Sequence, residues 1–576
     1  MLPFALLVQG SEPTEPLRWD VNRLPFTRRD AWVSVTGGRS YGTLVLHDVA
    51  APFDKDVIAE VTFRNPVESG AFEQWADPSH IEIRSPSGGH ARVWLVGTRA
   101  VALEAIGLDF RVVPIVAPKG GASKLSPVEA VWSVQSGRDL TLKCPRGLLK
   151  AAPDACDVLE SEGRILALIS LERPPGITLV ESIDYAANTA DADRNWHQFL
   201  KTMPEVPGDY RRSAELAWFN IWSCFLPKQG VFHYDSVVMS KAVMTYVWSW
   251  DHCFTALALA KTRPTEALDQ WMLPFPLMNE KGCLPDGWKA PADVQWYATK
   301  PPIHGWAFSK LMDEISIPRP RLEQAYNYLR RWTEFWLNER ESDHDGVPNY
   351  LVAGNDSGWD NATVFDQGAK VESPDLSAYL VLQMRCLARI ARTLDRPEEA
   401  RDWDSRADAL KAAFVAQLWV GDHFVAKHVG THAFDPKPTS LLMLMPLVLG
   451  KELPDGIVSA LVQQLKRDFL TAYGPASEAY RSPKYESNGY WRGPIWAPAT
   501  YLLADGLLRA GHRDLAYELA WRFCATVESA GGDYENFDAL TGQGLKAPGY
   551  TWTAAVHLLF LNEFLRAPGA PPLKKS

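Results

Sequence analysis

The stretch SPDLSAYLVLQMRCLARIARTLDRPEEARDWDSRADALKAAFVAQLW, residues 373–419, decides the fold class. Ser373 stands directly before Pro374, an order that starts a helix, because serine caps free backbone N–H groups and proline fits the first turn. After them, apolar residues recur at intervals of three and four, as on one face of a helix. The pattern predicts two consecutive helices, over 376–395 and 397–419.

The same spacing recurs from about residue 211 onward. Ten further helices are predicted, close to 211–225, 247–262, 265–278, 302–314, 320–340, 439–448, 455–469, 494–511, 513–529 and 551–566. Twelve helices fit six helical hairpins and favour an (α/α)6 barrel. An α-solenoid is the alternative, but the chain lacks the repeat of about 34 or 40 residues that is typical of solenoids.

The first 190 residues lack the helical spacing. Short runs rich in β-branched and aromatic residues alternate with Gly, Pro, Asn and Asp clusters, which predicts strands. These runs are TLVLHDV, DVIAEVTF, IEIRS, ARVWLVG, FRVVPIV, AVWSVQSG, RILALISLE and ITLVESIDY. Many short strands with turn signals indicate a β-sandwich. We therefore expect three segments, which are a β-sandwich over 1–190, a helical linker over 191–210 and a helical barrel over 211–576.

Composition limits the possible partners. The chain has 576 residues and a net charge of −10, so nucleic acid and anionic membrane surfaces are poor partners. The chain contains no run of eighteen apolar residues, which is about the length that a membrane-spanning helix needs. The start MLPFALLVQG is either a first strand or the remnant of a trimmed signal peptide. The compartment is taken as the cytoplasm unless the second interpretation holds, which would place the chain in the periplasm.

Cysteine and tryptophan usage narrow the chemistry. The seven cysteines are scattered without a CxxC pair, so neither a disulfide framework nor a zinc site is expected. The 23 tryptophans equal the phenylalanines in number. An acidic, tryptophan-rich chain suits stacking on sugar rings, although a place in the core is the more frequent one for any single tryptophan.

Two loops carry carboxylates whose surroundings suit proton transfer. NDSGWDNAT holds Asp360 directly after Trp359, and a carboxyl beside an indole is partly desolvated, which favours a neutral acid. GGDYENFDALTGQG holds Glu535 among glycines that let the backbone approach a ligand. Either motif alone has an ordinary interpretation as a polar turn. Together they supply the two carboxylates of glycoside hydrolysis, one to protonate the leaving oxygen and one to act as nucleophile or to activate water.

Two further motifs, YVWSWDHCF and NGYWRGPIW, place aromatic residues beside Asp251 and Arg492. An aspartate can accept hydrogen bonds from sugar hydroxyls while an indole packs on the ring, and an arginine can clamp a carboxylate. The four motifs precede the second, sixth, tenth and twelfth predicted helices. In a barrel of helical hairpins such loops lie at the same end, so we expect one shared face. The predicted binding residues are Tyr246, Trp250, Asp251, Trp288, Trp359, Trp491, Arg492 and Trp496.

The four motifs, in this order, resemble glycoside hydrolase family 63 over about residues 205–566. The resemblance implies an (α/α)6 barrel, inversion of the anomeric centre, and α-glucosides or mannosyl- and glucosylglycerate as substrates. It implies Asp360 as the general acid and Glu535 as the general base. It also implies the walls of the glycone subsite, which are Trp250 with Asp251 and Trp491 with Arg492. One departure stands out, because Lys300 precedes a Pro-Pro pair where bacterial members often have glutamine.

The sequence thus predicts a two-domain inverting α-glycosidase, an α-glucosidase with a carbohydrate substrate and no cofactor or metal. Inverting carboxyl groups stand about 6.5–9.5 Å apart, and we expect this separation for Asp360 and Glu535. The alternatives are an α-mannosidase, a mannosyl- or glucosylglycerate hydrolase, a polysaccharide lyase that uses Tyr490 and Arg492, and a non-catalytic sugar-binding protein. No motif requires calcium, and the oligomeric state is left open.

Overall fold

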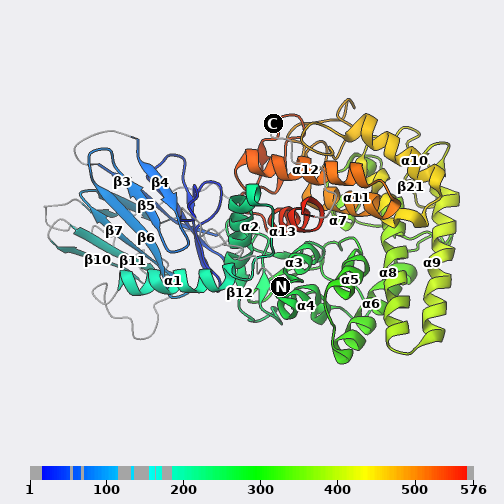
Figure 1. Ribbon diagram of the computed structural model, residues 1–576, viewed down its shortest axis with the longest axis horizontal. Helices are drawn as coiled ribbons and strands as arrows, with labels where there is room; N and C mark the ends of the chain where they lie inside the picture. The colour runs from blue at the N-terminus through cyan, green and yellow to red at the C-terminus, as the bar shows by residue number, and fades with distance from the viewer. Residues whose placement is uncertain are drawn as a thin grey trace, which may run out of the picture.

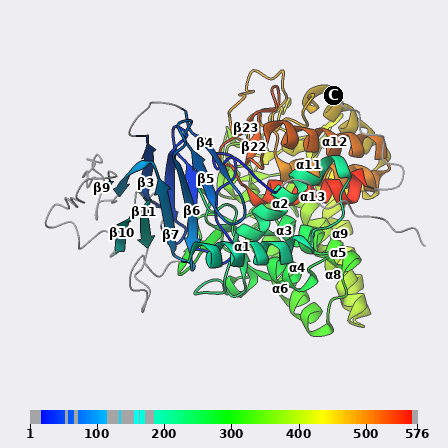
Figure 2. The same ribbon diagram turned by 60° about the vertical axis from the view of Figure 1, so that its left-hand side comes forward.

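The computed structural model describes residues 16–51, 56–65, 71–114, 132–134, 155–161, 164–170 and 184–566. The described chain forms two regions that lie side by side, with strands in the N-terminal part and helices from residue 185 onward (Figure 1). A view turned by 60° shows the same two regions (Figure 2). The coarse prediction of a β region followed by a helical region is confirmed. The possible first strand at residues 1–10 lies outside the described residues.

The β region consists of two antiparallel sheets. One has the strand order β1-β2-β3-β8-β9 and the other β10-β11-β7-β6-β5-β4. The strands are β1 (Val33–Gly37), β2 (Thr43–Asp48), β3 (Val57–Arg64), β4 (Glu73–Ala76), β5 (Ile81–Arg84), β6 (His90–Val96), β7 (Ala100–Ile106), β8 (Asp109–Pro114), β9 (Trp132–Val134), β10 (Ala155–Ser161) and β11 (Arg164–Ser170). Buried side chains of both sheets, among them Val35 and Leu103, belong to one hydrophobic core.

A long helix, α1 (Tyr185–Leu200), follows the β region. The predicted linker helix over 191–210 is therefore displaced, because the helix begins at Tyr185, where the side chain of Asp184 caps it by accepting a hydrogen bond from the Ala187 amide at 3.0 Å. The predicted strand ITLVESIDY is wrong at its end for the same reason, and its residues 177–183 lie outside the described chain.

Six helices of the helical region form a closed ring. In chain order they are α3 (His252–Leu259), α5 (His304–Glu314), α8 (Pro374–Thr393), η5 (Leu441–Glu452), α11 (Ala497–Ala510) and α13 (Thr551–Leu559). Each contacts the next in this order, and α13 contacts α3. These are the second, fourth, sixth, eighth, tenth and twelfth of the predicted helices, so alternate helices make the ring.

The other six predicted helices each contact a member of the ring. They are α2 (Arg211–Ser223), α4 (Pro264–Met272), α6 (Arg319–Glu339), α9 (Pro397–Leu418), α10 (Asp455–Gln464) and α12 (Arg513–Ala530). The burial patterns of the helices explain which of them form the ring and which pack against it. Ring helix α8 is buried on nearly all sides, whereas α9 buries a single stripe that includes Ala400, Trp403 and Ala407, as expected for a helix with one face in solvent.

The remaining elements are short. They comprise η2 (Gly208–Tyr210), η3 (Phe275–Leu277), α7 (Ala353–Ser357), η4 (Thr363–Phe365), the π-helices η6 (Leu465–Phe469) and η7 (Phe560–Leu565), and two- or three-residue strands. Those strands are β12 (Phe225–Leu226), β13 (Ser236–Val237), β14 (Val247–Trp248), β15 (Gly287–Lys289), β16 (Asp293–Gln295), β17 (Asn349–Tyr350), β18 (Val371–Glu372), β19 (Trp419–Val420), β20 (His423–Phe424), β21 (Lys427–His428), β22 (Asn536–Phe537) and β23 (Gly544–Leu545). Among the described residues, no helix has the length and apolar character that crossing a membrane requires.

Two predicted helices differ in detail from the structure. The segment predicted at 439–448 is the 3-10 helix η5, which contains Pro446 and therefore lacks one of the backbone donors that an α-helix needs. The helix predicted from 247 begins only at His252, because Val247 and Trp248 pair with β15 instead.

The two regions share contacts along the start of the helical region. The buried Lys241 donates from Nζ to the backbone oxygens of Arg28 at 2.9 Å and Phe225 at 3.0 Å. The rings of Trp19 and Phe219 lie 4.4 Å apart between centroids. Residues from both regions belong to the same hydrophobic core, so the β region packs on the helical region through an apolar contact that the hydrogen bonds of Lys241 supplement.

Close packing between ring helices gives the first prediction. A Cβ atom added at Gly506 in α11 would lie 2.2 Å from the backbone oxygen of Leu447 in η5, so Gly506→Ala should push these helices apart. Overpacking of this kind costs about 1–3 kcal/mol, and calorimetry should record a lower melting temperature.

The matched control is Gly456→Ala on α10, where an added Cβ meets no atom within 4 Å. Alanine is the better helix former, so this variant should melt at the parental temperature or slightly above it. Equal melting temperatures for both variants would contradict the close contact between α11 and η5.

Candidate active site

A pocket of about 190 Å³ lies where the loops before α3, α5, α8 and α11 meet the start of α13. Its lining includes Trp250, Asp251 and Asp360 from the predicted motifs, together with Tyr490 and Trp491. Five of the six ring helices thus contribute to one pocket at their N-terminal ends. Three of the four predicted motifs line this pocket, and the fourth is joined to it through Glu535, which accepts a hydrogen bond from the pocket residue Tyr490.

Asp360 reaches the pocket from the loop that follows α7. That short helix ends at Gly358, whose φ of 72° lies in the left-handed region that glycine adopts without strain. A Cβ at Gly358 would also lie 2.7 Å from the Trp250 ring, so only glycine lets this loop approach the indole. The Asp360 side chain is 35% exposed. Burial nevertheless raises the pKa of Asp360, while Lys300 and a hydrogen bond from Tyr490 oppose the rise.

Glu535 is more deeply placed, with 3% of its surface exposed. Its Oε1 accepts a hydrogen bond from the hydroxyl of Tyr490, a pocket-lining residue, at 2.9 Å. Its backbone N–H donates to the Ala547 oxygen at 2.8 Å, and its backbone oxygen accepts from Trp552 Nε1 at 3.1 Å. Burial raises the pKa of Glu535, and the Tyr490 hydrogen bond opposes the rise. Glu535 is therefore a rigidly held carboxyl group in a poorly solvated position.

Tyr490 links the two carboxyl groups, since its hydroxyl is bonded to Glu535 and also lowers the pKa of Asp360. Its φ is 64°, a left-handed conformation that is strained for a residue other than glycine. Such strain persists only where the surroundings impose the conformation. Here the neighbouring Gly489 oxygen accepts a hydrogen bond from Asn361 Nδ2 at 3.0 Å, and the Trp491 amide donates to Asn361 Oδ1 at 2.9 Å.

Lys300 is the cation among the pocket-lining residues that the sequence did not assign to the site, a group that also includes Trp248, Asp286, Tyr550 and Trp552. Its Nζ lies 3.0 Å from Asp286 Oδ1 and 3.8 Å from Asp360 Oδ1. It also donates to the Asn355 oxygen at 3.1 Å and lies over the Trp248 ring. Burial alone would lower the pKa of Lys300, but the two aspartates outweigh it and the pKa is raised. The departure from glutamine before Pro-Pro was the sequence signal that marked this position.

Asp251 also lines the pocket, immediately before α3, and is 1% exposed. Its Oδ2 has no hydrogen-bond partner in the part of the chain that the structure describes. Burial raises the pKa of Asp251 well above its usual value. A buried carboxyl oxygen without a protein partner at a pocket wall suits a ligand hydroxyl that would complete its hydrogen bonding.

The predicted tryptophans form a stack behind the pocket rather than a set of separate sugar platforms. Trp491 and Trp496 lie 3.8 Å apart with an interplanar angle of 4°, and Trp359 lies 4.5 Å from Trp491. Each of the three is 1% exposed. Trp250 and Trp491 line the pocket, whereas Trp359 and Trp496 support them. The stack removes water from the neighbourhood of Asp360 and thereby explains part of its desolvation.

Three other predicted binding residues require correction. Trp288 has 0% exposure because it pairs with Val247 in a small buried sheet, so it does not touch the pocket. The Tyr246 hydroxyl donates to Asp293, and its ring stacks behind Trp248, which does line the pocket. Arg492 donates to the Asn361 oxygen at 2.8 Å and to Asp366, so it braces the loop of Asp360.

A second group of carboxylates lies away from the pocket and could hold a hard cation such as calcium. One oxygen from each of Glu341, Asp343 and Asp345 lies within 4.8 Å of the others. The neighbouring Glu372 is fully buried, and both of its oxygens lack hydrogen-bond partners among the described residues, although His432 Nδ1 lies 3.8 Å from Oε2. Burial raises the pKa of Glu372 to about 8, helped by Asp345 and Asp343. Carboxylate oxygens are the ligands that calcium prefers.

Comparison with known proteins places this geometry in a family. Residues 244–553 match the family model described as "Mannosylglycerate hydrolase MGH1-like glycoside hydrolase domain". The mannosylglycerate hydrolase MGH1 of Selaginella moellendorffii is 24% identical over 406 residues, covering 56% of this chain and 82% of the relative.

Solved structures agree in fold. A GH63 mannosylglycerate hydrolase from Thermus thermophilus in complex with glucose is similar with a TM-score of 0.51 and 22% identity, covering 58% of this chain and 96% of that one. A bacterial glucoamylase complexed with acarbose is similar over 96% of this chain and 95% of its own, with a TM-score of 0.61 and 11% identity. The match to the family model spans more than half of the chain and contains both predicted catalytic carboxylates, and the chain is therefore a glycoside hydrolase that belongs to family 63.

Proposed function

We propose that this protein is an anomer-inverting α-glycosidase in which Asp360 is the general acid and Glu535 the general base. The observation that carries the proposal is a pair of desolvated carboxyl groups at one pocket, where Asp360 lines the wall and Glu535 is bonded to the wall residue Tyr490. The ring of six helices is the inner layer of an (α/α)6 barrel, which forms the catalytic domain from residue 211 onward. The two sheets before it form a β-sandwich domain, which ends before α1 begins at Tyr185.

Asp360 suits the acid because burial raises its pKa and thus favours the protonated form that donates to the leaving oxygen. Lys300 at 3.8 Å limits the rise. The ammonium group also stabilises the carboxylate that remains after proton transfer. Lys300 therefore tunes the acid and is a positioning residue rather than a proton donor.

Glu535 suits the base because it is fixed by Tyr490 and by the backbone of the 535–547 hairpin. A carboxylate held in this way can accept a proton from the water that attacks the anomeric carbon. The separation of about 6.5–9.5 Å that inversion requires stays a prediction for Asp360 and Glu535. A crystal structure with a bound monosaccharide would measure it.

Two substrate classes follow from different observations. The resemblance of the motifs to family 63 suggested an α-linked glucoside. The family model and the similar proteins carry the name mannosylglycerate hydrolase, which favours mannosylglycerate as a second candidate. Asp251 offers an unpartnered oxygen for a hydroxyl of either sugar.

Release of monosaccharide from a panel of substrates tests the proposal. The panel holds mannosylglycerate, glucosylglycerate, α-linked glucose disaccharides and α-linked mannose disaccharides, with β-linked counterparts as controls. We expect release from α-linked members and none from the β-linked ones. Release from the β-linked members alone would contradict the proposed function.

Asp360→Asn should lower kcat on natural α-glycosides by about 10²–10⁴-fold, because it deletes proton donation while keeping the shape of the side chain. Hydrolysis of the corresponding α-glycosyl fluoride should fall much less, because fluoride leaves without a proton. Glu535→Gln should lose both activities, because water activation is needed for either substrate. Steady-state kinetics on the two substrates measures the difference.

The control for these variants is Asp402→Asn, an exposed carboxylate on the outer helix α9. It should keep parental rates on both substrates. Equal losses of Asp360→Asn on the natural substrate and on the fluoride would show that Asp360 is not the acid.

Tyr490→Phe should move the whole pH profile of kcat/KM toward higher pH. The Tyr490 hydroxyl stabilises the ionised forms of both Asp360 and Glu535, so its removal raises both pKa values. The acidic limb reports the base and the alkaline limb reports the acid, so both limbs should shift upward. Tyr297→Phe, at an exposed position, is the control and should leave the profile unchanged. An unshifted profile for Tyr490→Phe would contradict the proposed link.

A further inference from the structure

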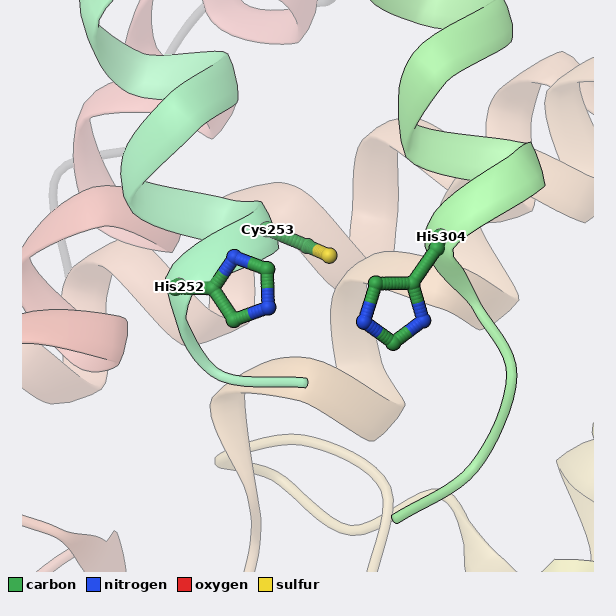
Figure 3. A group of neighbouring side chains, drawn as sticks. All are labelled: His252, Cys253 and His304. Atoms are coloured by element: carbon green, nitrogen blue, oxygen red, sulfur yellow. The ribbon is translucent and has the colours of Figure 1, made fainter. Parts of the chain in front are cut away.

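Beneath the wall of the pocket lies a group of potential metal ligands from two neighbouring ring helices. His252 and Cys253 are the first residues of α3, and His304 is the first residue of α5. All three side chains are fully buried, and one ligand atom from each lies within 4.8 Å of the others. Figure 3 shows the sulfur of Cys253 and one ring nitrogen of each histidine facing a common space.

The hydrogen bonds of His252 leave it ready to coordinate. Its Nδ1 lies 2.9 Å from the backbone oxygen of Gln270, which can only accept, so Nδ1 carries the proton. The lone pair is then on Nε2, which is buried and has no hydrogen-bond partner among the described residues. A histidine that ligates a metal commonly donates its other ring nitrogen to a backbone oxygen in this manner.

His304 has fewer hydrogen bonds than His252. Both of its ring nitrogens are buried without a well-aligned partner in the described chain, although the Ser249 backbone lies near enough to influence both imidazole rings. Burial lowers the pKa of His252 to about 3 and that of His304 well below its usual value. The two histidines thus place three buried ring nitrogens without a hydrogen-bond partner beside the Cys253 sulfur.

The surroundings of the group are aromatic. The ring centroid of Trp288 lies 6.3 Å from that of His252, and those of Phe275 and Trp332 lie 5.6 Å and 6.1 Å from that of His304. These rings offer no strong hydrogen bond to the histidine nitrogens that lack a partner, and a metal ion could occupy the lone pairs instead.

We propose that His252, Cys253 and His304 form a binding site for a soft metal cation, and that the fitting ion is copper(I). A thiolate and imidazole nitrogens are the ligands that copper(I) prefers. The charge of one cation and one thiolate cancels, whereas a divalent ion with these three ligands would leave a net positive charge among aromatic rings. On binding, the Cys253 thiol releases its proton to solvent, the S–H bond is replaced by an S–Cu bond, and no electron is transferred.

The position of the site indicates its role. It joins the first turns of α3 and α5, and His252 directly follows Asp251 of the pocket wall. The ion would fix two ring helices relative to each other without touching a substrate. The three ligands are not close in the sequence, because His304 begins a different helix from His252 and Cys253. For this reason the spacing of cysteines and histidines predicted no metal site.

A competition titration tests the site in the full-length protein. Under anaerobic, reducing conditions, copper(I) is titrated against the chromophoric chelator bathocuproine disulfonate. We expect the parental protein to retain one equivalent that Cys253→Ser and His304→Gln both lose. Cys386→Ser, at another buried cysteine on α8, is the matched control and should retain the equivalent. Copper(I) should raise the melting temperature of the parental protein and of the control, but not that of Cys253→Ser.

X-ray absorption of the copper-loaded parental protein supplies a readout that does not depend on the folding of any variant. One sulfur and two nitrogen neighbours support the proposal. Failure of the parental protein to retain copper(I), retention by a folded Cys253→Ser protein, or a copper environment without sulfur would each overturn it. Loss of copper leaves the proton chemistry of Asp360 and Glu535 in place, so failure of this proposal is separate from failure of the glycosidase proposal.

Discussion

The order of the helices is the constraint on which the rest of the structure depends. Alternate helices of the chain form the closed ring from α3 to α13, and the intervening helices pack against it. The loops before the ring helices therefore meet at one end, although more than two hundred residues separate the first from the last. Hydrogen bonds between the loops of Asp360 and Trp491 then fix the distance between motifs that the chain itself does not connect.

Desolvation changes the acidity of the carboxyl groups where these loops meet. Burial raises the pKa values of Asp251, Asp360 and Glu535 together, and the three would repel one another if all were ionised. Two groups oppose this rise in pKa, which are Lys300 beside Asp360 Oδ1 and the Tyr490 hydroxyl, which donates to Glu535 Oε1. The stack of Trp359, Trp491 and Trp496 supplies the low-dielectric wall that makes each of these effects large. The abundance of tryptophan is thus chiefly a property of the core, and it acts on the chemistry through the neighbouring carboxyl groups.

The sequence predicted the parts of this arrangement that are local or periodic. Apolar spacing located the six ring helices and the six helices packed on them, and the parity of these helices predicted one shared face for Asp251, Asp360 and Glu535. Side-chain direction was not predictable in the same way. Trp288 and Arg492 stand in motifs like those of true pocket residues, but a β-pairing buries the first and Asn361 with Asp366 holds the second. The start of α1 was missed because a capping aspartate follows a run with strand-like composition.

Contacts between segments that are distant in the sequence were the hardest to predict. Nothing in the order of residues brings Lys300 to Asp286 and Asp360, or His304 to Cys253, because each contact joins loops or turns of different helices. The left-handed conformation of Tyr490 likewise depends on Asn361 in another loop. These are the places where packing, and not local propensity, decides which atoms meet.

The proposed mechanism depends on the face of the sugar ring from which water attacks the anomeric carbon. Proton NMR, recorded immediately after the enzyme is mixed with an α-linked substrate, identifies the anomer that is released before mutarotation mixes the two forms. An acid at Asp360 and a base at Glu535 on opposite sides of the sugar predict that the β-anomer appears first. First appearance of the α-anomer would show retention and would contradict the assignment of the two carboxylates.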